Sequence, residues 1–363
     1  MWKTVKLGDA CLVRRGTTIT KKNAIEGDVP VIGGGTKPTY FHNEPNREAS
    51  CITISGSGAS AGFVNRWDLP IFASDCSTVE PKDKMQLPKF IYYYLLSQQQ
   101  FIYDNFRSGA AQPHVYAKDI ETLDFLILPL LEQERIVAKL DAAFADIDEA
   151  IENIGLKDTK LDQFKSKIIS DSFIDNDWDS KMLGDCITYE KKNAKGSSLP
   201  YVGMENITSQ SMDLIGEIAI PEKPKSSFHF NKRHVLFGRL RPYLRKVLVP
   251  NFEGQCSNEI FCIKPKENII REFLAYWLLE QKVSSKIEAT STGTRMPRAN
   301  MNALLEFDFP IPSIKEQKII VSKLDLIFEK NDRAKKTLVK SKANFLALKS
   351  ALLAQELQSG APA

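Results

Sequence analysis

The strongest constraint on the fold is a helical segment that occurs twice. Residues 132–141, EQERIVAKLD, return at 316–325 as EQKIIVSKLD, which sets a register of 184 residues. The same register aligns Phe144 with Phe328 without a gap. Self-similarity at a fixed distance indicates that one structural unit has been duplicated.

Apolar residues in both copies follow the alternating spacing of three and four residues that is typical of a coiled-coil seam. The predicted seam is Leu140, Phe144, Ile147, Ile151, Ile154, Leu161 and Ile168 in the first copy, and Ile320, Leu324, Ile327, Ala334, Leu338, Phe345, Leu348 and Leu352 in the second. Asn331 and Ser341 occupy the two remaining seam positions of the second copy. Gly155 weakens the first copy by about 1 kcal/mol relative to alanine. At about 1.5 Å per residue, each predicted helix is about 65 Å long.

The two predicted helices carry opposite charge. Residues 130–175 hold eleven acidic and six basic side chains, and residues 314–358 hold five acidic and ten basic ones. We therefore expect the helices to pair with each other within one chain. An antiparallel pairing is expected, because the chain must cross a whole domain between them, and it would place the two domains at opposite ends. A parallel pairing, or two unrelated surface helices with solvated charges, is the alternative.

The halves also begin and end alike. The sequence LGD at 7–9, preceded by Trp2, returns at 183–185, preceded by Trp178. Short β-type runs broken by Gly, Asn, Asp and Pro follow in both halves. Towards the end of each half comes an aromatic-Leu-Leu helix, FIYYYLL in the first half and FLAYWLL in the second, with a loop containing Gly and Pro after it. A proline then precedes each long helix.

These repeats predict an α+β fold with two mixed α/β domains in pseudo-two-fold tandem repeat, separated by two long antiparallel helices that form a coiled coil. The predicted boundaries are a first domain at 1–129, a first helix at 130–175, a second domain at 176–313, a second helix at 314–358 and a flexible tail at 359–363. The middles of the halves diverge, since GSGASAG in the first stands opposite RLRPYLR in the second. A common frame therefore presents two different surfaces.

Composition narrows the functional classes. A length of 363 residues suits two or three domains, and a net charge of +4 means that any anion-binding surface must be local. The six cysteines form no CxxC pair and no metal-like pattern with the four histidines, so we expect reduced cysteines and no metal. The chain has no apolar stretch of signal-peptide or membrane-spanning length, which predicts a cytoplasmic protein without a membrane partner.

With these motifs in hand, the chain resembles the specificity subunit of type I restriction-modification systems over essentially its whole length. The resemblance rests on the tandem half-repeat, the aromatic-Leu-Leu helix with its Gly loop, and the proline-led helix start that occurs twice. It implies two target-recognition domains, each reading half of a bipartite site in double-stranded DNA. It also implies that the paired helices act as a spacer and dock two modification (methyltransferase) subunits.

The resemblance assigns the chemistry to the partners. The modification subunits would carry S-adenosylmethionine and methylate adenine, and separate restriction (motor-nuclease) subunits would cut the DNA. The chain itself would bind no cofactor and would be a non-catalytic subunit. Consistent with this, it contains no Asn-Pro-Pro-aromatic or Asp-Pro-Pro-aromatic motif of the adenine methyltransferases.

The strongest DNA-contact signal lies at 232–246, within a stretch free of acidic residues between Glu222 and Glu253. Lysines can neutralise phosphates there, and a forked guanidinium can bind O6 and N7 of guanine. The second-domain candidates are Lys225, Lys232, Arg233, Arg239, Arg241, Tyr243, Arg245, Lys246, Arg295 and Arg298. A solvated basic hairpin is the alternative.

The first domain gives a weaker signal. Its candidates are Lys37, Tyr40, Ser55, Ser57, Arg66, Arg107, Ser108, Gln112 and His114. Serine and glutamine suit base edges without adding charge, and the neighbouring glycines permit close approach of the backbone to DNA. Each of these residues is equally well explained as an ordinary loop residue. The aromatic groups of the two aromatic-Leu-Leu helices are expected to pack in the core rather than stack on bases.

Two patterns imitate enzyme motifs. The glycine-rich run at 55–62 approximates a dinucleotide fingerprint, but the next residues read as a strand, so no helix would meet a phosphate. The sequence Glu80-Pro81-Lys82 after Asp75 imitates a nuclease motif, and a solvated turn explains it more simply. The sequence thus predicts a DNA-reading assembly subunit. A subunit of a methyltransferase-only complex and a coiled-coil scaffold that does not bind DNA remain the alternatives, and only the scaffold predicts no salt-dependent DNA binding by the assembled complex.

Overall fold

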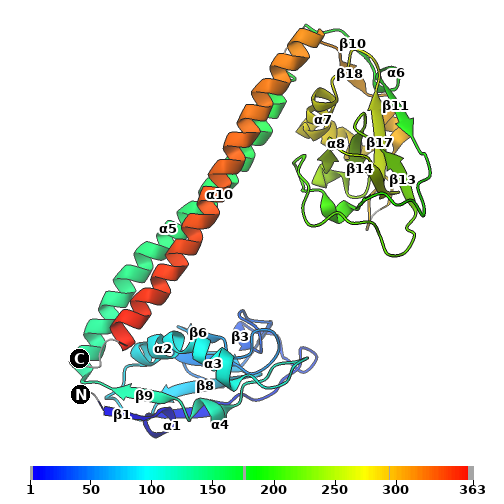
Figure 1. Cartoon of the computed structure of the whole chain (residues 1–363). Coiled ribbons are helices and arrows are strands. Elements are labelled where there is room, and N and C mark those ends of the chain that lie inside the picture. The colour runs from blue at the N-terminus through cyan, green and yellow to red at the C-terminus, as the bar shows by residue number, and fades with distance from the viewer. Residues whose placement is uncertain (1–2, 175–176, 294, 359–363) are drawn as a thin grey trace. The chain divides into compact units, whose positions relative to one another are not determined.

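The computed structural model of the protein describes residues 3–174, 177–293 and 295–358. Trp2 and the tail predicted at 359–363 lie outside the described residues. The chain divides into two compact units, one made of residues 1–154 with 340–363 and the other of residues 155–339. We call the part of the first unit before the long helix domain 1, and the part of the second unit between the two long helices domain 2 (Figure 1).

Domain 1 is β-rich. It contains a four-stranded sheet of order β2-β8-β5-β6, a three-stranded sheet of order β4-β3-β7, and the ribbon β1-β9. The strands are β1 (Lys3–Lys6), β2 (Cys11–Arg15), β3 (Val29–Ile32), β4 (Tyr40–His42), β5 (Cys51–Ser55), β6 (Val64–Trp67), β7 (Phe72–Ala73), β8 (Cys76–Pro81) and β9 (Asp124–Ile127). The helices are α1 (Leu7–Ala10), α2 (Pro88–Ser97), α3 (Gln99–Phe106) and α4 (Ala117–Ile120).

Domain 2 repeats the four-stranded sheet and the ribbon, whereas its three-stranded sheet has a different strand at its centre. Its sheets have the orders β11-β17-β14-β15 and β12-β16-β13, and its ribbon is β10-β18. The strands are β10 (Ser180–Met182), β11 (Ile187–Glu190), β12 (Tyr201–Val202), β13 (Ser227–Phe230), β14 (Val235–Gly238), β15 (Val247–Leu248), β16 (Gly254–Ser257), β17 (Ile260–Pro265) and β18 (Asp308–Pro310). The helices are α6 (Leu183–Cys186), η1 (Met204–Asn206), η2 (Pro242–Leu244), α7 (Arg271–Leu279), α8 (Gln281–Ala289) and α9 (Met301–Leu305).

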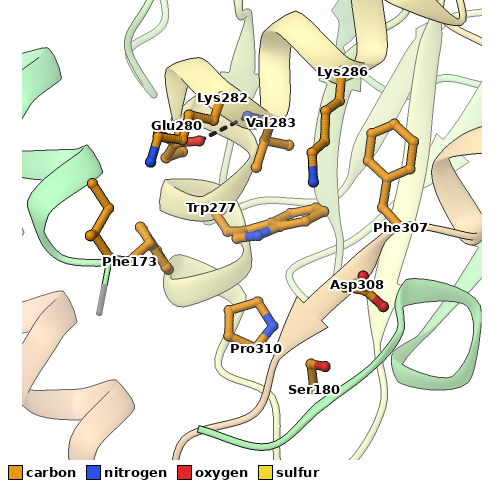
Figure 2. Close-up of a pocket in the computed structure, with 11 residues that line it drawn as sticks. Phe173, Ser180, Trp277, Glu280, Lys282, Val283, Lys286, Phe307, Asp308 and Pro310 are labelled. Atoms are coloured by element: carbon orange, nitrogen blue, oxygen red, sulfur yellow. Dashed lines mark hydrogen bonds between the residues drawn. The ribbon is translucent and has the colours of Figure 1, made fainter. Parts of the chain in front are cut away.

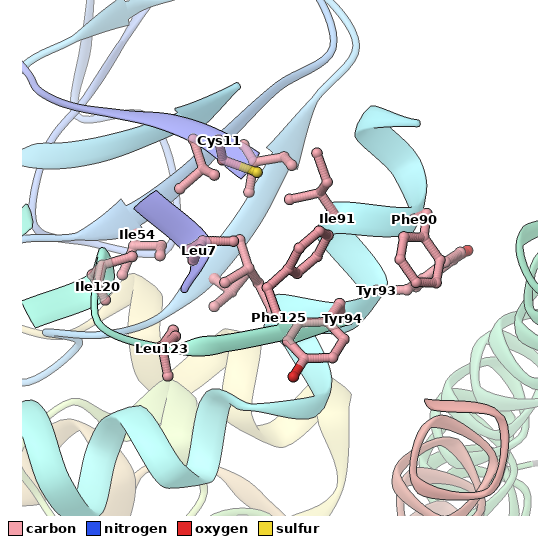
Figure 3. Packing of buried hydrophobic residues seen from close by; sticks show 14 of the residues in the cluster. Leu7, Cys11, Ile54, Phe90, Ile91, Tyr93, Tyr94, Ile120, Leu123 and Phe125 are labelled. Carbon is pink, nitrogen blue, oxygen red and sulfur yellow. The ribbon is translucent and has the colours of Figure 1, made fainter. Parts of the chain in front are cut away.

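The core of domain 1 lies between α2 and the four-stranded sheet. Phe90 and Ile91 of α2 are fully buried, and Phe125 of β9 lies edge-on to Phe90 and Tyr94 at ring distances of 6.1 and 5.0 Å (Figure 3). In domain 2 the equivalent α7 buries Trp277 against Phe309. The prediction that the aromatic-Leu-Leu helices pack in the core is therefore confirmed.

The long helices α5 (Leu130–Asp171) and α10 (Ile314–Gln358) pair antiparallel in each unit (Figure 1). In the first unit Lys139 contacts Glu356 at 2.6 Å and Asp148 contacts Lys349 at 2.5 Å. In the second unit Asp162 contacts Lys335 at 2.6 Å. Residue numbers rise along α5 while those of the facing residues fall along α10. These contacts exclude a parallel pairing and also exclude two unrelated surface helices.

Most predicted seam residues lie at the helix interface. Leu140, Phe144, Ile147 and Leu324 are buried, and the others are half-buried except Leu348, which is 45% exposed. The prediction for Leu348 is therefore wrong. A straight α-helix drifts by about 20° per heptad from a 3.5-residue repeat, so the contact line moves on by one residue. The half-buried Lys349 and the buried Leu353 take over at the carboxyl end of α10.

Two equivalent lysine–aromatic pairs mark the duplication within the helices. The Nζ atom of Lys165 lies 3.7 Å from the centroid of the Phe328 ring, and that of Lys349 lies 4.8 Å from the centroid of Phe144. Each pair is a cation–π contact between one helix and the other. Asn331 fills another position by donating from Nδ2 to the backbone O of Leu161 at 2.8 Å, a polar seam contact of the kind that fixes helix register.

A buried glutamine attaches each domain to its helix. The amide of Gln133 accepts from the backbone N of Leu87 at 2.8 Å and donates to Met85 O and Leu128 O at 2.8 and 2.9 Å. Both Gln133 and Gln317 are 0% exposed. The repeated Glu-Gln sequence is therefore explained by a requirement for this amide, which satisfies backbone groups that would otherwise be buried without a partner.

Gln317 makes the same contacts in the second unit. Its Oε1 accepts from Ile270 N at 2.8 Å, and its Nε2 donates to Asn268 O and Pro312 O at 2.9 and 3.0 Å. A phenol adds a further contact in each unit. Tyr93 donates to Asp141 at 2.5 Å and Tyr276 donates to Asp325 at 2.6 Å.

Within residues 3–174, 177–293 and 295–358, no helix is both long and apolar enough to cross a membrane.

We expect Gln317→Leu to lower the free energy of unfolding by on the order of 3 kcal/mol, because three backbone groups lose their partner inside the protein. Lys318→Ala, at an exposed neighbouring position, is the matched control and should change stability little. Chemical unfolding followed by circular dichroism measures both. Equal midpoints for the two variants would contradict the role assigned to this amide.

Candidate nucleic-acid interface

In each domain two loops pair with each other just beyond the end of a central strand. The first paired loops are residues 55–62, at the end of β5, and residues 107–114. The second paired loops are residues 239–245, after β14, and residues 292–298, of which Thr294 is not described. Isolated β-bridges join the two loops of each pair. The divergent sequences GSGASAG and RLRPYLR therefore occupy equivalent places, as the sequence comparison predicted.

The backbones of the two pairs match closely. Gly58 N donates to Pro113 O at 2.9 Å, and Arg241 N donates to Pro297 O at 2.7 Å. Gly58 and Arg241 both have left-handed backbones, with φ of 78° and 51°. This conformation costs a non-glycine residue on the order of 1 kcal/mol, and such strain concentrates at ligand-binding sites. Arg241 is thus held in a constrained position with its side chain exposed.

An acidic residue supports each pair. The β5–β8 and β14–β17 registers make Asp75 and Glu259 equivalent, since each directly precedes the strand that pairs beside the loop. Ser57 donates its hydroxyl to the carboxylate of Asp75. Arg298 donates to Glu259 from Nε and Nη2 at 2.9–3.1 Å, and Arg239 Nε lies 3.8 Å from the same carboxylate.

The carboxylates of Asp75 and Glu259 determine which side chains of the paired loops remain free to bind a ligand. The hydrogen bond to Glu259 raises the pKa of Arg298. The fork of Arg298 is occupied by this carboxylate, so it joins the loop 292–298 to the sheet rather than pointing freely outward. Sequence reasoning missed the roles of Asp75 and Glu259. Their equal position, each one residue before an equivalent strand, is the signal that could have revealed them.

The second paired loops expose Arg241, Tyr243 and Arg295. The side chain of Tyr243 is accessible, with the residue 46% exposed, and both arginines are exposed as well. Among the described residues, neither arginine takes part in an ion pair. A free guanidinium can contact a phosphate or a guanine edge, and an exposed phenol can contact a base or a sugar.

Two predicted DNA contacts are structural residues instead. Arg245 is buried, its Nη1 donates to Leu279 O at 3.0 Å at the end of α7, and burial lowers its pKa. Lys246 donates from Nζ to Met204 O at 2.6 Å, and burial lowers its pKa. Both predictions are corrected by these contacts. From the sequence alone, a basic residue in a polar run is expected to be solvated. The carbonyl groups that accept its hydrogen bonds are distant along the chain and cannot be recognised there.

The basic run at 232–246 is also divided by the fold. Lys232 and Arg233 precede β14, whereas Arg239 and Arg241 follow it, so the two groups lie at opposite ends of one strand. Lys225 is exposed beside β13, and its Nζ lies 4.4 Å from the centroid of the Tyr201 ring. The predicted single cluster is therefore at least two separate surfaces.

In domain 1 the paired loops contain Ser57, Arg107, Ser108, Gln112 and His114. Ser108 and His114 exchange two backbone hydrogen bonds of 3.0 and 2.8 Å, and both Ser108 and Gln112 are exposed. The half-buried His114 stacks on the Tyr116 ring with centroids 6.2 Å apart. Apart from Arg107, these side chains are polar and carry no fixed charge, in contrast to the arginines of the second paired loops.

Several first-domain candidates, inside and outside the paired loops, stabilise loops through their side chains. Their partners are Gly35 O for Ser55, Ile19 O for Tyr40, Asp68 for Arg66 and Ala61 O for Arg107, at 3.2, 2.6, 2.6 and 2.7 Å. Lys37 alone among the candidates outside the paired loops has a freely exposed side chain in this domain. Ser55 is 4% exposed, so its predicted contact with a base is corrected.

A recess of about 400 Å³ near the start of α8 has the size of a small-molecule site. Trp277, Phe307 and Val283 line it, with Lys282 and Lys286 on α8 (Figure 2). Glu280, the buried acid in its lining, accepts from Val283 N at 2.8 Å and from Ser170 at 2.7 Å. Its carboxylate is thus used as a helix cap and a helix contact.

The two enzyme-like sequences have structural explanations. Strand β6 follows the glycine-rich run, so no helix amino terminus faces it. Glu80 forms ion pairs with Arg14 and Arg47, at 2.5 and 3.7 Å. In the described part of the chain, no group of three or more His, Cys, Asp and Glu side chains could hold a metal ion.

A family model described as the type I restriction modification DNA specificity domain matches residues 1–155 and 176–341. The chain is similar to the specificity subunit of the type I restriction enzyme EcoDI from Escherichia coli, with 21% identity over 98% of this chain and 87% of that protein. It is also 21% identical to the MjaVIII specificity subunit from Methanocaldococcus jannaschii, over 96% of this chain and 91% of that protein.

Solved structures share the fold. A chain from a study of complex assembly and conformational transition in the type I R-M system matches with a TM-score of 0.74 and 17% identity, over 98% of this chain and 97% of that one. The HsdS subunit from Thermoanaerobacter tengcongensis matches with a TM-score of 0.51 and 18% identity, over 98% and 96% of the two chains.

Glu259→Gln should release Arg298 and loosen the second paired loops, because the amide keeps the shape of the carboxylate but loses its charge. We expect discrimination between DNA bases at one or two positions to fall by about 1–3 kcal/mol. Glu253→Gln removes the same charge from an exposed site in the same domain and is the control. Binding of the assembled complex to single-base variants of its site measures the effect, and unchanged discrimination in Glu259→Gln would refute it.

Proposed function

Since the chain belongs to the family of type I restriction-modification DNA specificity subunits, we propose that each domain reads one half of a bipartite DNA site through its paired loops. The chain is the non-catalytic DNA specificity subunit of a type I restriction-modification system. The observation that carries the finer proposal is the equivalence of the paired loops. Their backbones share the same bridges and most of the same hydrogen bonds, whereas most of their side chains differ.

The two pairs of loops suit different half-sites. In domain 2, the guanidinium groups of Arg241 and Arg295 can bind guanine or phosphate. Tyr243, two residues after Arg241, adds an exposed phenol. In domain 1, Gln112 and His114 offer amide and imidazole groups for base edges without net charge. The hydroxyl hydrogen of Ser57 is donated to Asp75, so only its oxygen remains available as an acceptor. The half-sites should therefore differ in sequence, and the whole site should be asymmetric.

The paired helices fit the role of a spacer. Their antiparallel seam and ion pairs join α5 to α10 in both units. Exposed apolar residues on the helices, among them Leu131, Phe164, Ile319 and Val339, provide surface for protein partners. The chain assembles in a type I restriction-modification complex, and we assign two modification subunits and the restriction subunits as its partners.

S-adenosylmethionine belongs to the modification subunits in this proposal, and methylation and cleavage are carried out by the partners. A methyltransferase-only complex would use the same architecture, because the nuclease is a separate protein. The two cases differ in whether unmethylated DNA is cut when all subunits of the system are present. A scaffold without DNA binding is disfavoured by the family to which the chain belongs.

Adenine-methylation mapping of the host genome tests the proposal. Deleting the gene should abolish methylation of one split, asymmetric motif. Replacing residues 176–313 with those of another specificity subunit should change one half of that motif and leave the other half intact. The proposal fails if the methylome is unchanged by deletion while the cognate modification subunit is expressed.

The helices should set the gap between the half-sites. Four residues inserted after Gly155 in α5 and four after Val339 in α10 lengthen both helices by about 6 Å, which corresponds to about two base pairs. We expect a longer unread gap with both half-sites unchanged. The same eight residues added to the exposed loop around Gly196 in domain 2 are the control. An altered base preference within a half-site would show that the helices do more than separate the domains.

A further inference from the structure

Domain 2 carries a second basic surface that the reading of bases does not explain. Lys232, Arg233, Lys264, Lys266 and Arg271 line an open recess of about 670 Å³, together with Thr188, Pro265, Glu267 and Ile269. We call it the basic recess. It lies at the start of β14 and the end of β17, whereas the second paired loops lie at the other end of these two strands. We propose that the basic recess binds the phosphate backbone of the same DNA duplex, away from the bases that domain 2 reads.

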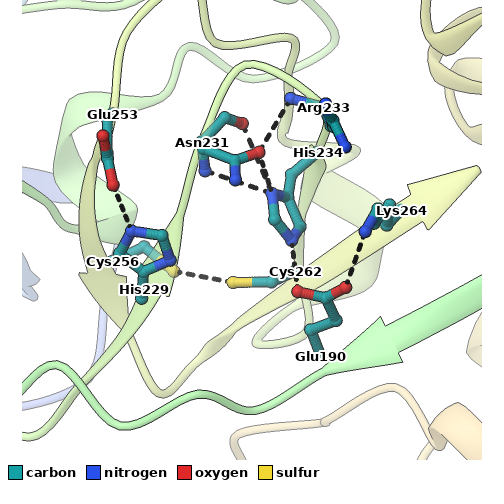
Figure 4. A network of polar contacts seen from close by, with 9 residues as sticks. All are labelled: Glu190, His229, Asn231, Arg233, His234, Glu253, Cys256, Cys262 and Lys264. Atoms are coloured by element: carbon teal, nitrogen blue, oxygen red, sulfur yellow. Dashed lines mark hydrogen bonds and ion pairs between the residues drawn. The ribbon is translucent and has the colours of Figure 1, made fainter.

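Hydrogen bonds from residues beside it hold the turn that carries Lys232 and Arg233 (Figure 4). His234 is 1% exposed and lies 3.0 Å from Oδ1 of Asn231, whose carboxamide also accepts from Arg233 N at 3.0 Å. The other ring nitrogen of His234 lies 3.1 Å from Glu190. The backbone of the turn is therefore held firmly, while the side chains of Lys232 and Arg233 are exposed.

Not every cation of the basic recess is available. Lys264 pairs with Glu190 at 3.3 Å, and Arg271 pairs with Glu272 at 3.1 Å. Lys266 donates to Gly184 O at 3.3 Å. A backbone carbonyl carries no net charge, so this contact does not neutralise the lysine. Within the described residues, Lys232 and Arg233 form no ion pair. These two side chains and Lys266 are the groups that can neutralise phosphates.

Domain 1 lacks this surface although its frame is the same. The strand registers and the Gln133 and Gln317 contacts define the equivalent positions. In the order Lys232, Arg233, Lys264, Lys266 and Arg271, the equivalents in domain 1 are Ala49, Ser50, Glu80, Lys82 and Pro88. Only one of the five positions keeps a cation, and one carries an acid. The basic recess is therefore a property of domain 2 alone.

This asymmetry favours DNA over a protein partner. Two copies of one modification subunit would present the same surface to both domains, so a docking site for them should be similar in both. An asymmetric duplex meets different surfaces in the two domains. The spacing also fits a duplex. Six residues separate Arg233 from Arg239, which spans about 20 Å of extended chain and corresponds to about six base pairs of DNA.

The basic recess thus deepens the proposed function and rests on it. Domain 2 reads bases with Arg241, Tyr243 and Arg295, and it holds the backbone about six base pairs away with Lys232 and Arg233. Such contacts fix register and orientation without carrying sequence information. Domain 2 should accordingly contribute more of the salt-dependent affinity than domain 1.

The test replaces the two free cations with their counterparts from domain 1, as Lys232→Ala with Arg233→Ser. Each lost phosphate contact lowers the slope of log affinity against log salt by about 0.9, so the slope should fall by about 1.8. Between 50 and 200 mM salt, the wild-type complex should then lose about 12-fold more affinity than the variant. The methylated motif should not change. Lys195→Ala with Lys223→Ala removes the same charge from exposed positions outside the basic recess and is the control.

Phosphate ethylation locates the contact. Ethylated phosphates about six base pairs from the half-site of domain 2 should interfere with binding by the wild-type complex and not by the variant. An unchanged slope, or a slope that falls equally in the control, overturns the inference while leaving the methylation motif as evidence for the proposed function. Loss of subunits from the variant complex, measured by its mass in solution, overturns it in favour of a protein-docking surface.

Discussion

The attachment of each domain to the helices depends on a single buried amide. Gln133 and Gln317 each satisfy one backbone N–H and two carbonyl groups at the corner where domain, proline and helix meet. Leaving such groups without partners would cost about 1–3 kcal/mol apiece. The corner is therefore fixed by hydrogen bonds with defined directions rather than by apolar contact, which tolerates sliding. A phenol-to-carboxylate bond, Tyr93 to Asp141 and Tyr276 to Asp325, adds a second fixed point in each unit.

The features that sequence predicted well are those with a period. The 184-residue repeat, the coiled-coil spacing and the opposite charges of the helices predicted that the two long helices pair and that each half carries a domain built on a repeated frame. Leu348 shows where periodicity alone fails, because a strict heptad ignores the drift of a straight helix. Lys349 takes its place by resting on the Phe144 ring, and a lysine would not be placed in a seam from composition.

The interface was harder to predict than the fold, for a physical reason. Whether a basic side chain is free depends on carbonyl and carboxylate groups far away in sequence. Arg245 and Arg298 look alike in sequence, yet one is buried under α7 and the other is engaged by Glu259. Arg241 differs from both, because its side chain is exposed and forms no ion pair with any described residue. The structure thus reduces a run of basic residues to a few available ones and separates them into two surfaces.

One ion pair between neighbouring strands has a consequence for how such a duplicated gene can recombine. Arg14 on β2 pairs with Glu80 on β8, and at the equivalent positions Glu190 on β11 pairs with Lys264 on β17. The charges are exchanged between the halves. A crossover between the two halves that falls between these strands would place Arg14 diagonally across from Lys264, or Glu190 diagonally across from Glu80, and like charges repel at diagonal positions that long side chains can bridge. Exchange of a complete domain keeps each pair intact. The inverted pair therefore favours inheritance of each domain as a whole.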